Sequence, residues 1–582
     1  MGVGVMSAGI GNVPAEQTFL DVGQGARISP TLYDDPLPLI YARLTTPRGR
    51  ARIPAPIWTE VRRRAEGAPA EIVPGLLGST LEAARVGTRS SLLAGSAATI
   101  LADEQGRTAS RRCGSCAAVS VTAATPRALA GMAHSLRGRD LLVAIERPPP
   151  AENRQLAIGI AGAGFDGTLT SDSTRIRGYI VSTDIAPTIL DRLGIAVPHQ
   201  MDGEPIRVDG AADAGAVQDL ESRLAAIGPR RGPVIGTNLL IWVAICALAG
   251  IAFGLRGLRT ALPILAVTVA YLPAVLFVTA ALEPSETAER LIVALGCPGL
   301  ALATLRLLPP LGAFACAGAL SVGCYAVDVV AGSHLTELSL IGPDPAAAVR
   351  FYGIGNELEA TVAALVPIAT GAALACWAPR ASPERAALAF AATALVAVAA
   401  FAPGRFGADV GAAIGIPIGA AVAVAVCLGL GRRRLVLVVA APLVAIAALV
   451  LADLLLGGNA HLTRSVLRAG GLDQLGDVAE RRLLLSAHSF GRYAQTAIFW
   501  IAVAAIVLGV LGRRRIEGWL GDRRAAWAGL VGAAGATVAG TLANDSGALL
   551  LIIGAAVAGA SVGLAWGTQG SGARRVRVVA VR

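Results

Sequence analysis

The chain has 582 residues, 54% of them hydrophobic, and its mean hydropathy of +0.62 excludes a wholly soluble protein of one domain. The formal charge is +10 at pH 7, and all basic residues counted in it are arginine, since the sequence contains no lysine. These arginines lie mainly in short loops between apolar segments. That distribution argues against a nucleic-acid partner and is typical of a protein oriented in a membrane.

Residues 1–207 have the pattern of an α/β domain. Thr125 followed by Pro126 is typical of a helix N-cap with proline at the first helical position, and it predicts a helix to about residue 136. Strands that alternate with helices favour a mostly parallel sheet covered on both faces. Short apolar and β-branched runs predict strands at 117–122, 141–145, 155–160 and 179–181.

The last of these strands leads into a helix over residues 184–195. Ser182, Thr183 and Asp184 precede the helix and can accept hydrogen bonds from the free N–H groups of its first turn. Pro187 fits only in that first turn, because proline has no N–H to donate. The segment therefore predicts a helix with a well-defined beginning.

This strand and helix, with Asp184, Pro187 and Thr188, resemble the C-terminal part of domains of the alkaline-phosphatase and sulfatase superfamily. Residues 198–206 continue the resemblance, and residues 2–25 resemble the part of such domains that follows the first strand. The resemblance implies an alkaline-phosphatase-like fold. It also implies that the strand with the first metal-binding Asp, and the helix with the Ser or Thr nucleophile, are missing from the chain.

Enzymes of this superfamily hold two metal ions with Asp and His ligands, which activate the nucleophile and stabilise the phosphoryl oxygens. Residues 1–207 contain only His134 and His199, and no Asp-His-Gly sequence. Two isolated histidines cannot complete a two-metal site. We therefore expect a degenerate relative without a metal cofactor. The alternative is an active enzyme with two divalent metal ions, whose nucleophile segment is missing from this chain.

Two short motifs in the domain have a simple structural interpretation. Residues 162–167 match G-x-G-x-x-G after a strand, but the residues that follow do not open a helix, which a dinucleotide site needs. Cys113 and Cys116 form a C-x-x-C pair without the strand-to-helix context of a thioredoxin motif. A local disulfide or a chance pair is favoured over a redox function.

Residues 208–232 predict a helical connector, and residues 233–570 predict a polytopic membrane domain, followed by a tail at 571–582. A bilayer core requires roughly 20 residues of helix, which gives about eleven spans. We place them near 236–254, 260–282, 288–306, 310–331, 357–377, 386–402, 409–430, 434–454, 494–512, 525–541 and 546–566.

Arginines gather in alternate loops of this domain, at Arg256, Arg306, Arg380, Arg432 and Arg513, and again in the tail. The positive-inside rule makes these loops and the tail cytoplasmic, and it places residues 1–232 outside a bacterial plasma membrane. An exported domain needs a signal peptide or an earlier span, and residues 1–30 have neither a basic region nor an apolar core. Either a signal helix precedes Met1, which we favour because the loops agree, or the orientation is inverted.

Polar and charged residues gather at the predicted outer ends of the spans. Ionisable groups in apolar helices are costly to insert, so they are candidates for function. We expect an outer water-filled cavity in which an arginine pairs with a carboxylate or a substrate phosphate. The alternative is that each residue is only a hydrated loop end. The candidates are Arg350, Tyr352, Asn356, Glu357, Asp409, Asn544 and Asp545.

The sequences at 350–357, 407–411, 461–464 and 544–547 resemble an uncharacterised bacterial family of polytopic proteins with alkaline-phosphatase-like outer domains. The resemblance implies an architecture but no reaction, so two function hypotheses remain. The first is a cell-envelope protein in the lipid bilayer that binds a lipid-linked or phosphorylated envelope intermediate in its cavity. Its outer domain would recognise the phosphate or glycan. The second is the metal-dependent phosphohydrolase or phosphotransferase, anchored by the spans.

Overall fold

The computed structural model describes residues 1–28, 52–68, 71–108, 117–148, 154–431, 434–455 and 489–569. The chain forms two compact units. The first contains Met1–Gly228 and also Asp344–Phe351, and the second contains Pro229–Pro343 and Tyr352–Arg582. The segment Asp344–Phe351, which we call the strap, therefore packs with the first unit although the sequence on either side of it belongs to the second.

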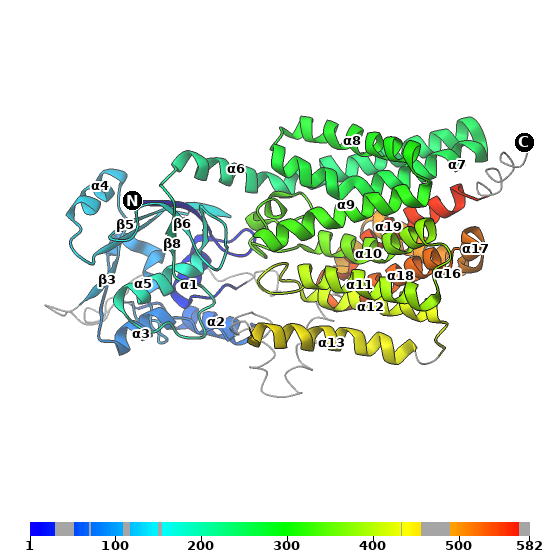
Figure 1. The fold of residues 1–582 in the computed structure, drawn as a ribbon. Helices are drawn as coiled ribbons and strands as arrows, with labels where there is room; N and C mark the ends of the chain where they lie inside the picture. The colour runs from blue at the N-terminus through cyan, green and yellow to red at the C-terminus, as the bar shows by residue number, and fades with distance from the viewer. Residues whose placement is uncertain are drawn as a thin grey trace, which may run out of the picture. The chain divides into compact units, whose positions relative to one another are not determined.

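The first unit is built on a mixed sheet, of which Figure 1 labels β5, β6 and β8. Its strands run in the order β4-β5-β1-β6-β8, with β7 also paired to β1. The central strand β1 is parallel to β6 and β7 and antiparallel to β5. The strands are β1 (Gly2–Ser7), β4 (Leu141–Ile145), β5 (Gln155–Gly162), β6 (Thr168–Thr170), β7 (Tyr179–Val181) and β8 (Arg207–Asp209).

The prediction of a mostly parallel sheet is wrong. β4 and β5 are antiparallel neighbours, with Leu141 opposite Gly162 and Ile145 opposite Ile158. The stretch between them, residues 146–154, is too short for a helical crossover, which a parallel pair requires. The predicted positions of these strands are nevertheless confirmed, because they follow from local apolar runs and not from strand pairing.

Helices α1 and α5 pack against this sheet. Buried Met6 and Ile180 of the sheet share one core with Val22 of α1 and Leu190 of α5. The helices of the unit are α1 (Ala15–Gln24), α2 (Ala55–Glu66), α3 (Leu76–Ala83), α4 (Pro126–Ser135), α5 (Ile185–Leu193) and α6 (Ala214–Arg231), the last of which runs on into the second unit. A separate parallel pair is formed by β2 (Gly87–Ser90) and β3 (Ala118–Val121).

Two of the predicted helix beginnings can be compared with the structure. α4 is as predicted, with Pro126 at its first position and the Thr125 hydroxyl accepting from the Ala128 N–H at 3.3 Å. Asp184, in contrast, does not cap α5 with its side chain. Its carboxylate accepts from the Ser171 and Ser173 hydroxyls at 2.6 and 2.5 Å.

The Asp184 carboxylate also accepts backbone N–H groups of Val181 at 3.1 Å and of Glu204 at 3.0 Å. The Thr188 hydroxyl donates to the Asp184 carbonyl at 2.6 Å and accepts from the Ile206 N–H at 2.8 Å. Asp184 and Thr188 thus attach the beginning of α5 to the segment that follows the helix, at Glu204 and Ile206. Asp184 caps the 3-10 turn Ser182–Asp184, which leads into α5, by accepting the Val181 N–H, and it does not cap α5 itself. Its other donors come from residues more distant in the sequence.

The second unit is a bundle of apolar helices. Eight helices of the described chain are long and apolar enough to cross a membrane, or nine if α16 and α17, bent by 71° at their junction, are one span. The helices are α7 (Thr237–Leu282), α8 (Glu286–Leu307), α9 (Pro310–Ala331), α10 (Asn356–Trp377), α11 (Pro383–Phe401), α12 (Val410–Leu428), α13 (Arg434–Leu455), α16 (Ala497–Leu511), α17 (Arg513–Leu520), α18 (Arg524–Ala543) and α19 (Gly547–Gly567).

Helix α7 folds back on itself. Gly254 has φ 60° and ψ −147°, which breaks the helix. In a straight helix Cys246 and Ala261 would lie about 22 Å apart. The Cys246 Sγ instead lies 3.7 Å from the Ala261 carbonyl oxygen. α7 is therefore a helical hairpin with its turn at Gly254.

Helices α10, α12 and α18 pack side by side in the bundle (Figure 1). A Cβ on Gly532 of α18 would lie 2.7 Å from the Gly419 carbonyl of α12, and one on Gly371 of α10 would collide with the Ala525 carbonyl. Small residues let the helix backbones approach closely, which is how membrane helices gain packing energy.

Replacement of Thr188 by Val should destabilise the first unit by about 1–3 kcal/mol, because the buried N–H of Ile206 would lose its acceptor. Thr188→Ser keeps the hydroxyl and is the matched control. The measurement is the unfolding midpoint of the detergent-solubilised chain in urea. Equal midpoints for the Val and Ser variants would contradict the assigned role of the hydroxyl.

Candidate functional site

A network of amides and hydroxyls joins the beginning of α10 to the α18–α19 connection. The Asn356 Nδ2 donates to the Ser546 hydroxyl at 2.8 Å and to the Asp545 Oδ1 at 3.5 Å. The Asn544 Nδ2 donates to the Asn356 Oδ1 at 3.2 Å. Three of the predicted residues, Asn356, Asn544 and Asp545, are therefore in contact, although nearly two hundred positions separate them in the sequence. We call this set, with Ser546, the amide network.

The amide network is continued inward by Glu359, which the sequence analysis missed. Its side chain is 2% exposed, and its Oε2 accepts from the Asn544 Nδ2 at 2.7 Å. Gly411 of α12 lies directly against it, because a Cβ at Gly411 would collide with the Glu359 carboxylate. A carboxylate within an apolar helix is itself a functional signal, and that signal was available in the sequence.

An ion pair in the same unit holds Glu357. The Arg231 Nη1 donates to the Glu357 Oε1 at 2.5 Å, and its Nη2 donates to the Gly342 carbonyl at 2.9 Å. The Arg231 Nε is buried and has no hydrogen-bond partner among the described residues. Arg230 forms a second pair with the buried Glu289 at 3.2 Å. Sequence reasoning placed both arginines in a connector and so missed them.

The other predicted residues have different positions. Asp409 is 1% exposed and caps α12, accepting from the Ala412 N–H at 2.7 Å. Tyr352 is half-buried in the second unit, whereas Arg350 belongs to the strap and so to the first unit. The predicted grouping of Arg350 with the other candidates stays a prediction. The positions of Cys113 and Cys116 lie outside the described residues.

The two ends of the bundle carry different residues. At the end opposite the amide network, the Arg259 guanidinium lies 5.6 Å from the centre of the Trp566 ring, where α19 ends beside the turn of α7. Arg524, at the start of α18, lies near Gly429, where α12 ends. The arginine-bearing helix ends thus gather at one end of the bundle, and Asn356, Glu359 and Asp409 belong to the other.

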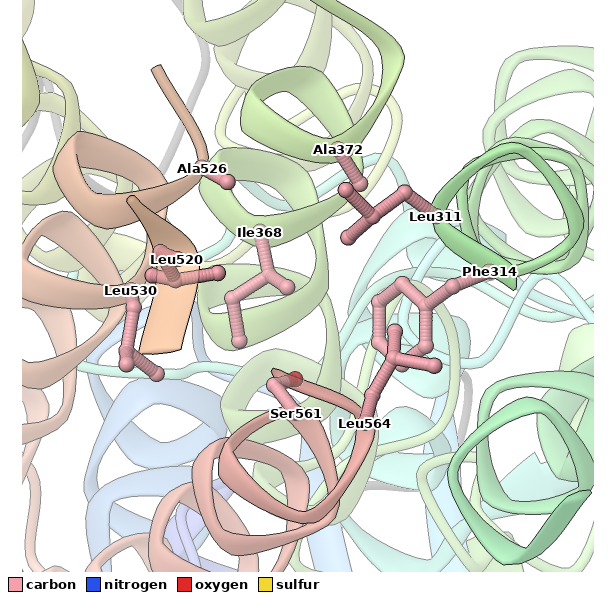
Figure 2. Close-up of a pocket in the computed structure, with 9 residues that line it drawn as sticks. All are labelled: Leu311, Phe314, Ile368, Ala372, Leu520, Ala526, Leu530, Ser561 and Leu564. Carbon is pink, nitrogen blue, oxygen red and sulfur yellow. The ribbon is translucent and has the colours of Figure 1, made fainter. Parts of the chain in front are cut away.

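A cavity of about 20 Å³ lies inside the bundle, in its arginine-bearing half (Figure 2). This volume holds about one water molecule, and the lining is almost wholly apolar. The Ser561 hydroxyl is the one polar side-chain atom that the close-up displays. The lining residues are Leu311, Phe314, Ile368, Ala372, Leu520, Ala526, Leu530, Ser561 and Leu564. The cavity is too small for a substrate, so it does not compete with the amide network as a candidate site.

The first unit holds a second polar cluster, on α1. The Asp21 Oδ1 accepts from the Nε2 atoms of Gln17 and Gln24 at 2.5 and 3.1 Å, and all three side chains are buried. Their spacing places them on one face of the helix. Burial raises the pKa of Asp21 well above its ordinary value, an effect that the Gln17 hydrogen bond and the charge of Arg27 reduce only in part. Burial also raises the pKa of Asp184.

The two histidines of the domain are both exposed. The His134 Nδ1 lies 2.7 Å from the Ala130 carbonyl of its own helix, and the His199 Nε2 lies 3.6 Å from a Glu71 carboxylate oxygen. Among the described residues, no group of three or more His, Cys, Asp or Glu side chains is placed to hold a metal ion. The residues that the structure describes therefore do not fit a two-metal centre.

The chain matches no protein-family model, no curated protein and no solved structure.

Substitution of Gly411 by Ala should destabilise the bundle by about 1–3 kcal/mol, because the added methyl would overlap the Glu359 carboxylate. Gly323→Ala in α9 is the matched control, since a Cβ there meets nothing within 4 Å. The thermal unfolding midpoint in detergent is the measurement. If both variants unfold at the same temperature, the close contact between α12 and Glu359 is incorrect.

Asp21→Asn should raise the unfolding temperature more at about pH 8 than at about pH 5. The folded chain favours neutral Asp21 because its pKa is raised, so ionisation as the pH rises through that pKa opposes folding. Asparagine cannot ionise and keeps the shape of the side chain. Asp202→Asn, at an exposed position of the same unit, is the control. A gain independent of pH would count against a raised pKa.

Proposed function

We propose that the chain is a multi-pass protein of the bacterial plasma membrane that binds a lipid-linked or phosphorylated intermediate of the cell envelope. Its ligand site is the polar end of the helical unit, around the amide network and Arg231. The first unit, as a degenerate alkaline-phosphatase-like domain, recognises the phosphate or glycan of the same intermediate. The observation that carries the proposal is a buried guanidinium N–H, the Arg231 Nε, that has no partner among the described residues.

The proposal includes eleven crossings of the membrane. Eight helices meet the criteria of length and apolarity. The hairpin at Gly254 supports a second crossing within α7, the apolar stretch Val436–Ala452 supports one by α13, and the bent pair α16–α17 supports one more. These three additions bring the number to the eleven that the hydrophobic segments of the sequence favour.

The proposed orientation follows from the two ends of the bundle. The end with Arg259 and Arg524 is cytoplasmic by the positive-inside rule, together with the C-terminus. The amide network then faces the outside, as does the first unit. This arrangement suits a ligand whose polar head group is presented at the outer surface of the membrane.

Arg231 suits a phosphate because a guanidinium binds oxyanions through several N–H groups at once. It now donates to Glu357 and to the Gly342 carbonyl. A phosphate oxygen would compete with the Glu357 carboxylate for the same guanidinium. The ion pair therefore sets the affinity of the site, because the ligand must weaken the pair in order to bind.

A metal-dependent phosphohydrolase is the second candidate function. Asp21 and Asp184 favour it, because both carboxylates are buried close to the ends of β1 and β7, and ligand groups of α/β sheets gather at the carboxyl ends of parallel strands. It ranks second, because among the described residues no group of three or more ligand side chains could hold a metal.

A binding experiment with a short polyprenyl monophosphate tests the proposal. Farnesyl phosphate should bind the detergent-solubilised chain more tightly than farnesol, since farnesol lacks the phosphate. Arg231→Gln should lower the affinity for farnesyl phosphate and leave the affinity for farnesol unchanged. Glu357→Gln should strengthen farnesyl phosphate binding by roughly tenfold, because it releases a charge-assisted hydrogen bond of Arg231. The measurement is titration calorimetry.

Glu286→Gln is the matched control, since Glu286 is exposed in the first turn of α8. It should leave both affinities unchanged. Equal affinities for farnesyl phosphate and farnesol, or full binding by a folded Arg231→Gln chain, would disprove the proposed ligand class.

A further inference from the structure

Three hydrogen-bond donors of the first unit converge on carbonyl oxygens of the strap. The Arg27 Nη1 donates to the Ala348 carbonyl at 2.5 Å. The Gly11 N–H donates to the Ala347 carbonyl at 2.9 Å, and the Tyr179 hydroxyl donates to the Pro345 carbonyl at 3.3 Å. A guanidinium, a backbone N–H and a phenol thus bind acceptors that lie within four consecutive residues.

These donors lie at the edge of the sheet where α/β folds bind ligands. Gly11 is in the loop that follows β1, and Arg27 follows α1, the next helix. The Tyr179 side chain interacts with Ser7, the last residue of β1. The donors therefore gather at the carboxyl end of β1, which is a general location of ligand sites in sheets with parallel strands.

The strap fills this edge closely. Ala346 and Ala348 are 2% and 0% exposed. The Phe351 ring, which is 6% exposed, has its centre 5.0 Å from the Arg27 guanidinium carbon and 5.9 Å from the centre of the Tyr179 ring. The Phe351 ring thus packs against both Arg27 and Tyr179. The carbonyl oxygens of the strap accept the hydrogen bonds that these two side chains donate.

The backbone of the strap is strained. Asp344 has φ 54° and Ala348 has φ 56°, values in the left-handed region that side chains with a Cβ disfavour. The contacts with Arg27, Gly11 and Tyr179 hold this conformation. A segment that is held by specific contacts against its own backbone preference is suited to exchange with a competing ligand.

The chemistry of the donors defines that ligand. A guanidinium, an N–H and a hydroxyl are the groups that bind oxyanions, and the strap offers them only neutral carbonyl oxygens. The carboxylates of Asp21, Asp184 and Asp202 act electrostatically on Arg27 and oppose an anion. Burial raises the pKa of Asp21 well above its ordinary value, which reduces the part of this opposition that comes from Asp21.

We propose that Arg27, Gly11 and Tyr179 form a binding site for a phosphoryl group, and that the strap closes this site by presenting carbonyl oxygens in place of the phosphoryl oxygens. Opening of the strap exposes the donors, and binding of the phosphoryl group keeps the strap open. This proposal rests on the proposed function in one respect, since it names the residues with which the first unit would recognise a phosphate. It does not involve Arg231 or the amide network, which belong to the second unit.

Two substitutions in the strap should act in opposite directions on inorganic phosphate, the probe. Phe351→Ala removes the aromatic contact and loosens the strap, so phosphate should bind about tenfold more tightly than to the unmodified chain. Ala348→Gly relieves the left-handed strain and stabilises the strap, so phosphate should bind more weakly. Affinity is measured by titration calorimetry on the full chain in detergent, and opening by hydrogen exchange of peptides that cover residues 344–351.

Arg27→Gln combined with Phe351→Ala should open the strap and yet lose phosphate binding. Arg231→Gln should leave the phosphate affinity of the Phe351→Ala chain unchanged, which separates this site from the one in the helical unit. Three outcomes would overturn the proposal: unchanged affinity in both strap variants, retained binding without Arg27, or loss of binding with Arg231→Gln in a folded chain.

Discussion

Hydrogen bonds to buried carboxylates hold separate parts of the sequence together in both units. In the first unit, Asp184 accepts from Ser171, Ser173, Val181 and Glu204, and so ties α5 to the loop before β7 and to the tail after the helix. A carboxylate without these donors could not be buried at acceptable cost. The alternating apolar residues build the sheet and its core, but the carboxylate fixes which loops meet at its edge.

Glu359 has the corresponding position in the helical unit. Its partner Asn544 belongs to a connection between helices, and Gly411 provides the space beside it. The helices themselves pack through glycine and alanine, which give close contact but little selectivity between neighbours. A polar contact in an apolar bundle supplies that selectivity, because a pairing of helices that separates Glu359 from Asn544 would lose this hydrogen bond.

The elements that could be predicted from the sequence are those whose position is determined by a few neighbouring residues. The strand at 179–181 and the helix after Thr125 were located correctly, since β-branched runs and a cap before proline act over a few residues. The direction of β4 depends on the length of one connection, and the donors of Asp184 come from other loops, so neither could be read from a local pattern. The hydrogen bond between Arg27 and Ala348 joins positions 321 apart, and no feature of either sequence segment indicates the other.

The strap also affects the order in which the protein folds. Residues 1–228 leave the ribosome first, and α7, α8 and α9 are all made before Asp344–Phe351 follows. The first unit is therefore incomplete at the edge of its sheet until α7, α8, α9 and the strap have been made. A fragment that ends at Gly228 would lack the strap and would therefore reproduce the incomplete first unit, not the finished one. During that interval the strap carbonyls that accept hydrogen bonds from Arg27 and Tyr179 have not yet been made.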